Sequence, residues 1–266
     1  MTEPGSSGGT AVAEFWDERA SLEEQAGTQD LIAKELEIEA IAKYVKNGMR
    51  VLDAGCGNGM TALELVSRYD IEITAIDSSE NMIDAAILRG TTKADLRGQV
   101  NFYVADVANL PDDLGMFDLI YPERTLINLL DRKRRENAMV GLCSLLAPRG
   151  LYVMCENSHD GLAEINRLRD RLDLPEIVPP WHNHYLDQAD IDGFERAVKD
   201  VAVYLWGEDN DYSSTYYFLS RIVNAAMAAE EGREPEYDSF VNRLALKLPA
   251  LVNGFGQGRI WLWRRI

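Results

Sequence analysis

The stretch VLDAGCGNGM at residues 51–60 decides the fold. A short apolar run leads into three glycines at alternate positions, and a helix-forming sequence follows them. Glycine permits the tight turn between a strand and a helix, and it lets a ligand approach the backbone closely. The segment therefore predicts a nucleotide-type cofactor at the carboxyl end of a strand.

Three glycine-rich motifs compete for this segment. A P-loop requires Gly-Lys-Ser/Thr, which is absent here. A dinucleotide-binding turn requires a small third residue, and that position is Met60. In the third interpretation, Asp53 precedes a Gly-x-Gly-x-Gly pattern by two residues. Its carboxylate suits a cofactor that carries an ammonium and a sulfonium rather than a pyrophosphate.

Apolar, β-rich runs alternate with helical patterns on both sides of this turn. Strands of this kind, separated by helices, predict a doubly wound α/β domain with a parallel sheet covered on both faces. The expected strands are residues 49–54, 71–76, 100–105, 117–121, 151–155, 201–206 and 259–265. The expected helices are residues 29–46, 60–68, 80–88, 132–146, 161–172, 213–229 and 237–248.

Two more carboxylates follow strands that neighbour the first. Asp77 ends the second strand and can accept both hydroxyls of a ribose. Asp106 ends the third strand and can accept from an adenine amino group. The carboxyl ends of parallel strands meet at one edge of the sheet, where ligands bind in open α/β folds.

Residues 49–156 resemble the class I S-adenosylmethionine-dependent methyltransferases. The resemblance rests on residues 51–59, on Asp77 with Met82, on Asp106 with Pro111, and on the fourth strand at 117–120. It implies S-adenosylmethionine as the cofactor and S-adenosylhomocysteine as the product. It also implies a Rossmann-like, seven-stranded sheet whose last strand, residues 259–265, is antiparallel. Pro148-Arg149-Gly150 departs from the Pro-Gly-Gly often found before strand five, which affects only a turn.

The same resemblance assigns a cofactor site and an N-terminal helical lid. The lid segment includes Trp16, Arg19, Gly27, Thr28 and Asp30, although a surface helix packed on the sheet explains the same residues. The expected cofactor-binding residues are Trp16, Arg19, Thr28, Asp53, Gly55, Gly57, Asp77, Ser78, Met82, Asp106, Val107 and Glu123.

The acceptor of the methyl group is expected to be a small polar molecule. The sequence after the fourth strand, YPERTLIN at 121–128, lacks the Asn/Asp-Pro-Pro-aromatic pattern of amino methylation on nucleobases or glutamine, and it has no cysteine for methylation of nucleobase carbons. With 44 acidic and 27 basic side chains the net charge is -17. The one basic run, residues 132–135, begins a helix with acidic neighbours, so we expect no nucleic-acid partner.

Two histidines follow a Pro-Pro break at residues 179–180. In extended backbone His182 and His184 would face the same side. They are candidates for a catalytic base and its support, for two metal ligands, or for ordinary loop packing. We assign His182, His184 and Arg124 as catalytic candidates and assign no metal.

The acceptor is expected to bind beyond the fourth and fifth strands. This part resembles small-molecule methyltransferases of bacterial polysaccharide and natural-product gene clusters. Tyrosine and arginine can clamp a polar or anionic acceptor, although an aromatic stripe at helical spacing also fits a core. The expected substrate-binding residues are Arg124, Asn128, Asn157, Trp181, His182, His184, Tyr185, Tyr216 and Arg221.

The chain is expected to form one elaborated domain over residues 11–266, after a disordered segment 1–10 rich in Gly, Ser and Thr. Its parts are a lid at 11–47, a cofactor-binding core at 48–158, and substrate-side elements at 159–266 with a helical insertion at about 207–255. No apolar run reaches the length of a membrane span, and no basic segment precedes an apolar one. Three cysteines are an odd count without metal-ligand spacing. We therefore expect a soluble, cytoplasmic protein with no membrane partner, and the oligomeric state stays open.

The leading hypothesis is a methyltransferase that acts on an oxygen of a small polar metabolite, such as a sugar or a compound bearing a phosphate or carboxylate. The alternatives are an amine N-methyltransferase and a non-catalytic protein with a methyltransferase-like fold. An oxidoreductase that uses a nicotinamide cofactor is disfavoured by Met60.

Overall fold

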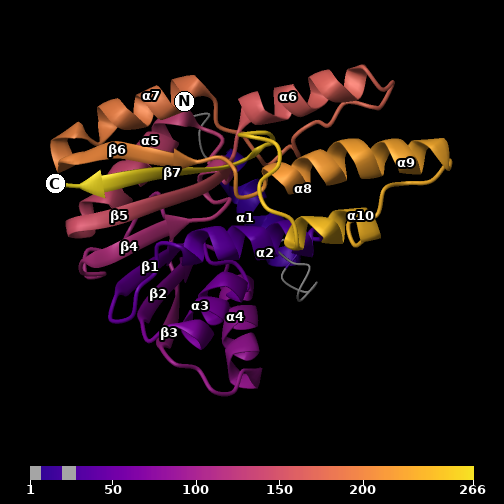
Figure 1. Ribbon diagram of the computed structural model, residues 1–266. Coiled ribbons are helices and arrows are strands. Elements are labelled where there is room, and N and C mark those ends of the chain that lie inside the picture. Colours follow the sequence, from indigo (N-terminus) through magenta and orange to yellow (C-terminus); the bar gives the residue numbers. More distant parts are fainter. Residues whose placement is uncertain (1–6, 20–27) are drawn as a thin grey trace.

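The computed structural model describes residues 7–19 and 28–266, and these include one seven-stranded sheet in the order β3-β2-β1-β4-β5-β7-β6. β7 runs antiparallel to β5 and to β6, and the pairs among β1 to β5 are parallel. The doubly wound fold with an antiparallel last strand is thus confirmed (Figure 1). The strands are β1 Arg50–Ala54, β2 Glu72–Asp77, β3 Gln99–Val104, β4 Phe117–Pro122, β5 Leu146–Asn157, β6 Val203–Asp209 and β7 Gly258–Arg265.

Helices connect the strands, and most lie within a few residues of the predicted bounds. α7 follows the histidine segment and was not predicted. The helices are α1 Ser7–Arg19, α2 Leu31–Ala42, α3 Met60–Arg68, α4 Glu80–Thr92, α5 Arg132–Ser144, α6 His159–Asp170, α7 Gln188–Ala197, α8 Ser214–Phe218, α9 Ala225–Glu230 and α10 Phe240–Arg243.

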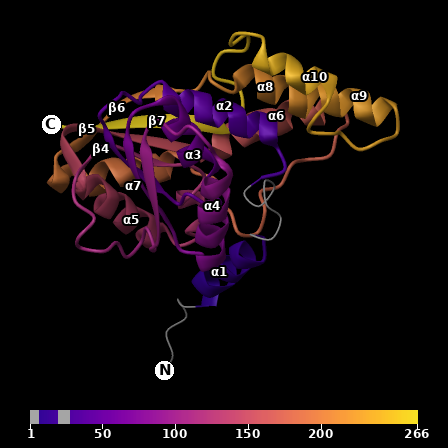
Figure 2. The same cartoon turned by 90° about the horizontal axis from the view of Figure 1, so that it is seen from below.

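Alternate residues of each central strand enter two different cores. Val51 packs with Ile41 of α2 and with α3, whereas Leu52 belongs to the core that contains Met139 of α5 and Phe194 of α7. Figure 2 shows α2 and α3 on one face of the sheet and α5 and α7 on the other. Burial on both faces explains why these strands are apolar throughout rather than alternating.

The turn from β1 to α3 uses backbone conformations that favour glycine. Gly55, Gly57 and Gly59 have φ angles of +88°, +52° and +74°. A Cβ at Gly55 would lie 2.3 Å from Thr125 Oγ1, so glycine is also required there for space. The turn is tied to the neighbouring strand because the amides of Gly55 and Cys56 both donate to the Ile76 carbonyl, at 2.8 and 2.9 Å.

α1 begins inside the segment that was expected to be disordered. Residues 1–6 lie outside the described residues, but residues 7–10 are helical, which corrects that prediction. Glycine and serine are poor helix formers, so the helix depends on its packing. Trp16 contacts the buried Met82 of α4, and Phe15 packs edge-on against Trp16.

The segment between β6 and β7 forms a helical insertion at the right of Figure 1. α8 continues through a π-helical turn, Leu219–Asn224, into α9. Tyr216, Tyr217 and Phe255 of the insertion share a small core with Ile32 of α2 and Ile165 of α6. The insertion therefore packs against α2 and α6.

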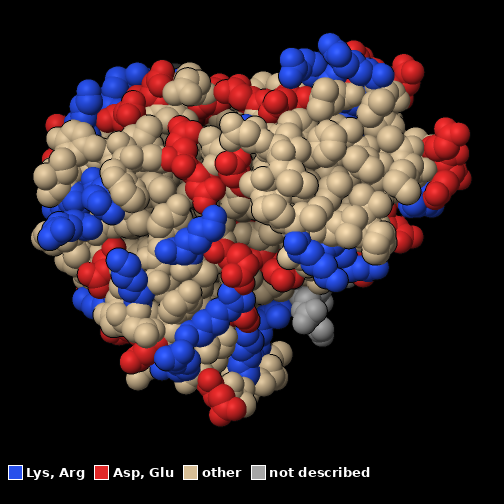
Figure 3. Space-filling model, in the orientation of Figure 1, with Lys and Arg blue, Asp and Glu red and all other residues tan. Residues whose placement is uncertain are grey.

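The surface of the described part mixes both signs of charge. Acidic and basic side chains are interspersed on the face shown in Figure 3, with a broad uncharged area over the helical insertion. Within the described ranges, none of the helices combines the length and the apolar character that crossing a bilayer requires.

Candidate active site

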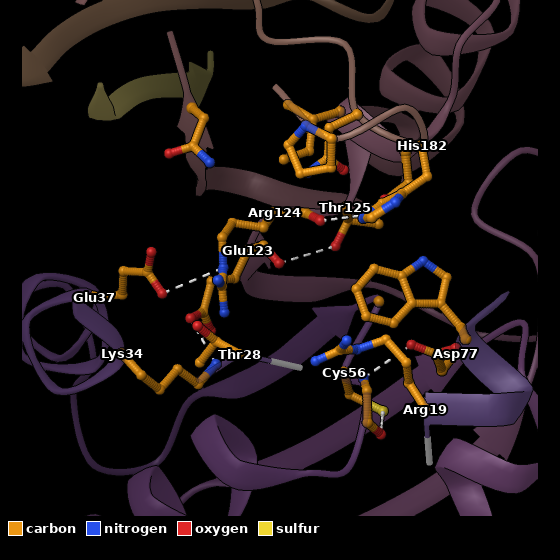
Figure 4. Close-up of a pocket in the computed structure, with 18 of the residues that line it drawn as sticks. Arg19, Thr28, Lys34, Glu37, Cys56, Asp77, Glu123, Arg124, Thr125 and His182 are labelled. Atoms are coloured by element: carbon orange, nitrogen blue, oxygen red, sulfur yellow. Dashed lines mark hydrogen bonds and ion pairs between the residues drawn. The ribbon is translucent and has the colours of Figure 1, made fainter. Parts of the chain in front are cut away.

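A cavity of about 510 Å³ opens at the carboxyl ends of the strands (Figure 4). Its floor includes residues that end or follow β1, β2, β3, β4 and β5, and its walls come from α1, α2 and the insertion. This volume lies in the range of about 300–1,000 Å³ that is typical of small-molecule sites. All of the expected cofactor residues line it: Trp16, Arg19, Thr28, Asp53, Gly55, Gly57, Asp77, Ser78, Met82, Asp106, Val107 and Glu123.

Asp53 presents an unpartnered oxygen at the end of β1. Its Oδ2 accepts from the Tyr121 hydroxyl at 2.8 Å, whereas Oδ1 is buried with no hydrogen-bond partner among the described residues. Burial raises the pKa of Asp53 to about 8. A cationic donor beside Oδ1 would stabilise the carboxylate, so the residue fits a ligand that carries an ammonium group.

Asp77 organises the glycine turn and also lines the cavity. Its Oδ2 accepts from the Gly57 amide at 2.8 Å and its Oδ1 from the Ser79 amide at 2.9 Å. Burial raises the pKa of Asp77 above its ordinary value. Each carboxylate oxygen keeps a second lone pair, which leaves the residue able to accept from ligand hydroxyls.

Asp106 also lines the cavity, but it already has partners. Arg134 of α5 lies 2.7 Å from its Oδ2, and the Ala108 amide donates to Oδ1 at 2.8 Å. A ligand amino group at Asp106 would therefore share the carboxylate with Arg134, which the sequence motif did not predict.

A cluster of buried charges joins α2 to the end of β4. Lys34 lies 2.6 Å from Glu123, whose second oxygen accepts from Thr61 at 2.6 Å. Glu37 lies one helical turn beyond Lys34, with its Oε2 3.4 Å from Arg124 Nε. Figure 4 shows Glu37 directed toward Arg124. The sequence reasoning assigned neither Lys34 nor Glu37 to the site.

The pKa values of Glu37 and Glu123, the two carboxyl groups of this cluster, are shifted in opposite directions. Burial raises the pKa of Glu37 to about 8, against the opposing effect of Arg124. Burial would also raise the pKa of Glu123, but Lys34, with Glu37 and Arg124, lowers it to about 2. Of the two carboxyl groups, Glu123 is therefore the one favoured as the ionised partner of Lys34, and Glu37 is the one more easily protonated.

The turn after β4 is fixed from beneath by Glu156 of β5. This buried carboxyl accepts from the amides of Thr125 at 2.9 Å and Leu126 at 2.7 Å. Burial raises the pKa of Glu156 to about 8, although these backbone hydrogen bonds oppose the shift. Arg124, which begins the turn, has a φ of +53°, in the left-handed region.

His182 lines the cavity inside an aromatic cluster. Its ring stacks on Phe15 at 4.1 Å between centroids, with the edges of Trp16 and Trp181 at 5.5 and 5.4 Å. Burial, and then the nearby Arg19, lowers the pKa of His182 below its ordinary value. The imidazole is therefore neutral near pH 7 and able to accept a proton.

His184 lies apart from the cavity lining. Its Nε2 is 2.8 Å from Asp190 of α7, and that carboxylate also pairs with Arg135 at 2.8 Å. The prediction that both histidines face the same side is wrong, because a turn at residues 181–182 breaks the extended backbone on which it depended. His184 instead connects the loop to α7, so the structure does not bring it to the site.

Two more of the expected acceptor residues lie outside the cavity lining. Trp181 is 61% exposed and packs against Phe15. Tyr216 is buried and donates from its hydroxyl to Asp30 at 2.5 Å, so the core interpretation of the aromatic stripe holds for it, and its neighbour Tyr217 lines the cavity. The other expected acceptor residues line the cavity: Arg124, Asn128, Asn157, His182, Tyr185 and Arg221.

Other cavity residues were missed because no short motif marks them. The missed residues include Phe15, Lys34, Glu37, Thr125, Asn183, Tyr217, Tyr237 and Gln257. Gly27, which was expected in the lid, lies outside the described residues. Within residues 7–19 and 28–266, no three His, Cys, Asp or Glu side chains converge as a metal site requires.

Comparisons with known proteins agree with this geometry. Residues 51–150 match a family model described as a methyltransferase domain. An O-methyltransferase of Aspergillus nomiae is 35% identical over 103 residues, 38% of this chain and 43% of that protein. The 27-O-demethylrifamycin SV methyltransferase of Amycolatopsis mediterranei is 33% identical over 120 residues, 44% of this chain and 41% of that protein. The chain thus spans less than half the length of either relative.

The whole structure is also similar to a solved one. It superposes on the magnesium protoporphyrin IX methyltransferase of Synechocystis PCC 6803, solved with bound S-adenosylhomocysteine, with a TM-score of 0.59 and 16% identity. The superposition covers 97% of this chain and 99% of that one. At this identity the similarity concerns the fold.

Proposed function

Because this chain belongs to the class I S-adenosylmethionine-dependent methyltransferases, by its fold and by the domain at residues 51–150, we propose that it methylates an oxygen atom of a small polar molecule. S-adenosylmethionine is the methyl donor and S-adenosylhomocysteine is the product. When bound, this cofactor supplies an electrophilic methyl group on a sulfonium that is a good leaving group.

The observation that carries the proposal is the buried, unpartnered Oδ1 of Asp53 beside the glycine turn. Asp53 would pair with the ammonium of the cofactor, and Asp77 would accept from its ribose hydroxyls. Gly57 leaves room for close approach, because a Cβ there would contact nothing within 4 Å. These features fit S-adenosylmethionine better than a pyrophosphate-bearing nucleotide.

His182 is the base that this proposal assigns. A hydroxyl acceptor loses its proton as the new oxygen–carbon bond forms, and a neutral imidazole at the cavity wall can take that proton. Phe15 and Trp16 cover His182 and exclude water from that side. Arg124 and Asn157 would orient the acceptor, since both line the cavity at the ends of β4 and β5.

The first test is calorimetric titration of the protein with S-adenosylmethionine, and separately with NAD and NADP. We expect micromolar binding of the first and none of the nicotinamide cofactors. Binding of NAD or NADP instead would overturn the interpretation of the glycine turn. If none of the three binds, the non-catalytic alternative is favoured.

The second test separates oxygen from nitrogen acceptors. We expect His182→Ala to lower kcat on hydroxyl acceptors by about 10²–10⁴-fold and to leave the cofactor Kd within twofold. His184→Ala is the matched control, because His184 lies outside the cavity. Methylation of amines alone, with no effect of His182→Ala, would identify an amine N-methyltransferase, since a neutral amine needs no base.

The cysteines support a location in a reducing compartment. Cys56, Cys143 and Cys155 are all unpaired thiols. Free thiols are usual in cytoplasmic proteins, so we propose that the enzyme acts there on a soluble metabolite.

A further inference from the structure

Arg124 presents an unsatisfied guanidinium to the cavity. Its Nε is buried without a hydrogen-bond partner and lies 3.4 Å from the Glu37 carboxyl. Within the described residues, its terminal nitrogens donate to no oxygen. By contrast, the other basic residue at the acceptor side, Arg221, is paired with Asp30 at 2.8 Å.

The backbone at Arg124 is held in a conformation that costs about 1 kcal/mol for a residue with a Cβ. Three contacts hold it there. The Arg124 amide donates to the Cys155 carbonyl at 2.8 Å, and Asn128 donates to the Arg124 carbonyl at 2.7 Å. Glu156 fixes the residues that follow. A non-glycine residue kept in this region at the edge of a cavity points to a functional requirement.

The charge of Arg124 is only partly balanced by its neighbours. Lys34 already pairs with Glu123 at 2.6 Å. Glu37, the remaining carboxyl of the cluster, lies 3.4 Å from Arg124 Nε, and burial raises its pKa, which weakens it as a counter-charge. A cation in a buried site is stabilised by an anion, so the site is incomplete without one.

Side-chain amide groups that line the same cavity also have capacity for hydrogen bonds. Asn128 Oδ1 and Gln257 Oε1 are buried with no hydrogen-bond partner among the described residues. The Asn157 side chain, which also lines the cavity, makes no hydrogen bond within the same residues. These groups suit a ligand that carries hydroxyls next to its anionic group.

We propose that the methyl acceptor is a hydroxylated carboxylic acid, and that Arg124 binds its carboxylate. The planar guanidinium matches a carboxylate in a two-point contact. This proposal rests on the proposed methyltransferase function and names the substrate class of the same site.

S-adenosylmethionine also carries a carboxylate. The position of Arg124 in the cavity indicates whether it would bind the carboxylate of the cofactor or that of the acceptor. Arg124 is tied to Cys155 of β5, on the side of β4 that lies away from β1 and β2. The residues proposed for the cofactor, Asp53 and Asp77, end β1 and β2. Arg124 therefore lies on the acceptor side of the cavity.

The experiment measures binding of paired probes to the protein saturated with S-adenosylhomocysteine. The pairs are 4-hydroxybenzoate with 4-hydroxybenzamide, and glucuronate with glucuronamide; in each pair a neutral amide of similar size replaces the carboxylate. We expect at least one acid to bind about ten- to a hundred-fold more tightly than its amide, and Arg124→Gln to abolish that preference. If no acid binds more tightly than its amide, or if the preference survives in the variant, the proposal is wrong.

Titration of Arg124→Gln with S-adenosylmethionine tests whether Arg124 binds the carboxylate of the cofactor instead. We expect a Kd within twofold of the wild-type value. A Kd raised tenfold or more would show that Arg124 binds the cofactor, and would overturn the proposal while leaving the methyltransferase function intact. Failure of the wild-type protein to bind S-adenosylmethionine would instead contradict the proposed function itself.

Two further variants guard against a folding defect. Arg124→Lys keeps the charge but not the two-point geometry, and we expect it to retain a reduced preference for the acid. Arg167→Gln, at an exposed position of α6, is the matched control and should behave as wild type. If Arg124→Gln melts below the assay temperature, the result for Arg124→Lys decides: a preference equal to that of wild type contradicts the proposal.

Discussion

The two halves of the cavity are built in different ways. The half over β1 and β2 comes from one continuous stretch, in which Asp53, the glycine turn and Asp77 lie within about one strand–helix–strand unit. The half over β4 and β5 gathers Glu37, Arg124, Asn157 and Arg221 from four separate elements. A site built from one local unit can be recognised as a motif, whereas a site assembled across the fold leaves no such pattern.

The two halves also differ in charge. Asp53 accepts from the Tyr121 hydroxyl and Asp77 from two backbone amides, so that half favours cationic and hydroxyl groups of a ligand. At the end of β4, Arg124 is the group without a full counter-charge. The cavity therefore carries acidic groups at the ends of β1 and β2 and a basic group at the end of β4. Three substitutions test this difference between its two halves.

The largest effect is expected from Glu156→Gln, which alters the support of the β4 turn. The pKa of Glu156 is raised to about 8, so its contribution to stability is present below pH 4.5 and is lost as the pH rises toward 8. A glutamine stays neutral and its carbonyl oxygen can still accept from the two amides. We expect the variant to be more stable than wild type by up to about 3 kcal/mol at pH 7, and not at pH 4.5.

Thermal and urea unfolding between pH 4.5 and 9 measure this difference. Glu195→Gln, at an exposed position of α7, is the control and should leave the pH profile unchanged. Parallel profiles for Glu156→Gln and wild type would contradict the buried, protonated carboxyl. The cofactor Kd should stay within twofold, because Glu156 supports the other half of the cavity.

A smaller effect is expected from Asp77→Ala, which removes a charged acceptor from the cofactor half. The loss of a hydrogen bond to a charged group costs about 1.5–3 kcal/mol, so the Kd for S-adenosylmethionine should rise by about 10- to 150-fold. Calorimetry measures the change. Asp118→Ala is the matched control, because Asp118 also accepts from a backbone amide, that of Arg50, but lies outside the cavity lining. An unchanged Kd for Asp77→Ala would refute the ribose assignment.

The smallest effect concerns proton release at Asp53. Burial raises its pKa to about 8, so at pH 7 the free protein carries a proton there, and pairing with the cofactor ammonium favours its release. We expect the binding of S-adenosylmethionine at pH 7 to release up to one proton, and the affinity to increase from pH 6 to pH 8. Titrations in buffers with different ionisation enthalpies count the protons. The Asp53→Asn variant should release fewer protons than wild type when it binds S-adenosylmethionine. Equal numbers of released protons in the two proteins would exclude Asp53 as their source.

The sheet and the cofactor half could be predicted from the sequence. The parallel strands are buried on both faces, which makes them apolar runs, and the turn at residues 51–60 needs glycine for conformation and for space. Every residue predicted to contact the cofactor lines the cavity. Their binding roles stay predictions until the titrations are done.

The acceptor half was predicted less well, for a physical reason. The placement of His182 and His184 depended on the backbone conformation of a loop, and a turn at residues 181–182 separates the two side chains. Tyr216 and Tyr217 are adjacent on one helix, and only packing against α2 determines which of them reaches the cavity. Glu37 lies in an ordinary helical pattern, and its role appears only when α2 meets the end of β4.

The π-helical turn of the insertion has a consequence for comparing related sequences. Such a turn holds one residue more than the α-helical turn it replaces, and it absorbs that residue locally, so the helix on either side keeps its face. It follows the segment of Tyr217, which lines the cavity, and ends at Asn224, which donates to the Glu236 carbonyl at 3.1 Å. A relative with a single-residue gap within residues 219–224 would have an uninterrupted α-helix, and its α9 would keep the same face toward the core. Such a gap would mark a relative that lacks the wider turn carrying Arg221, and whose acceptor wall therefore has a different shape.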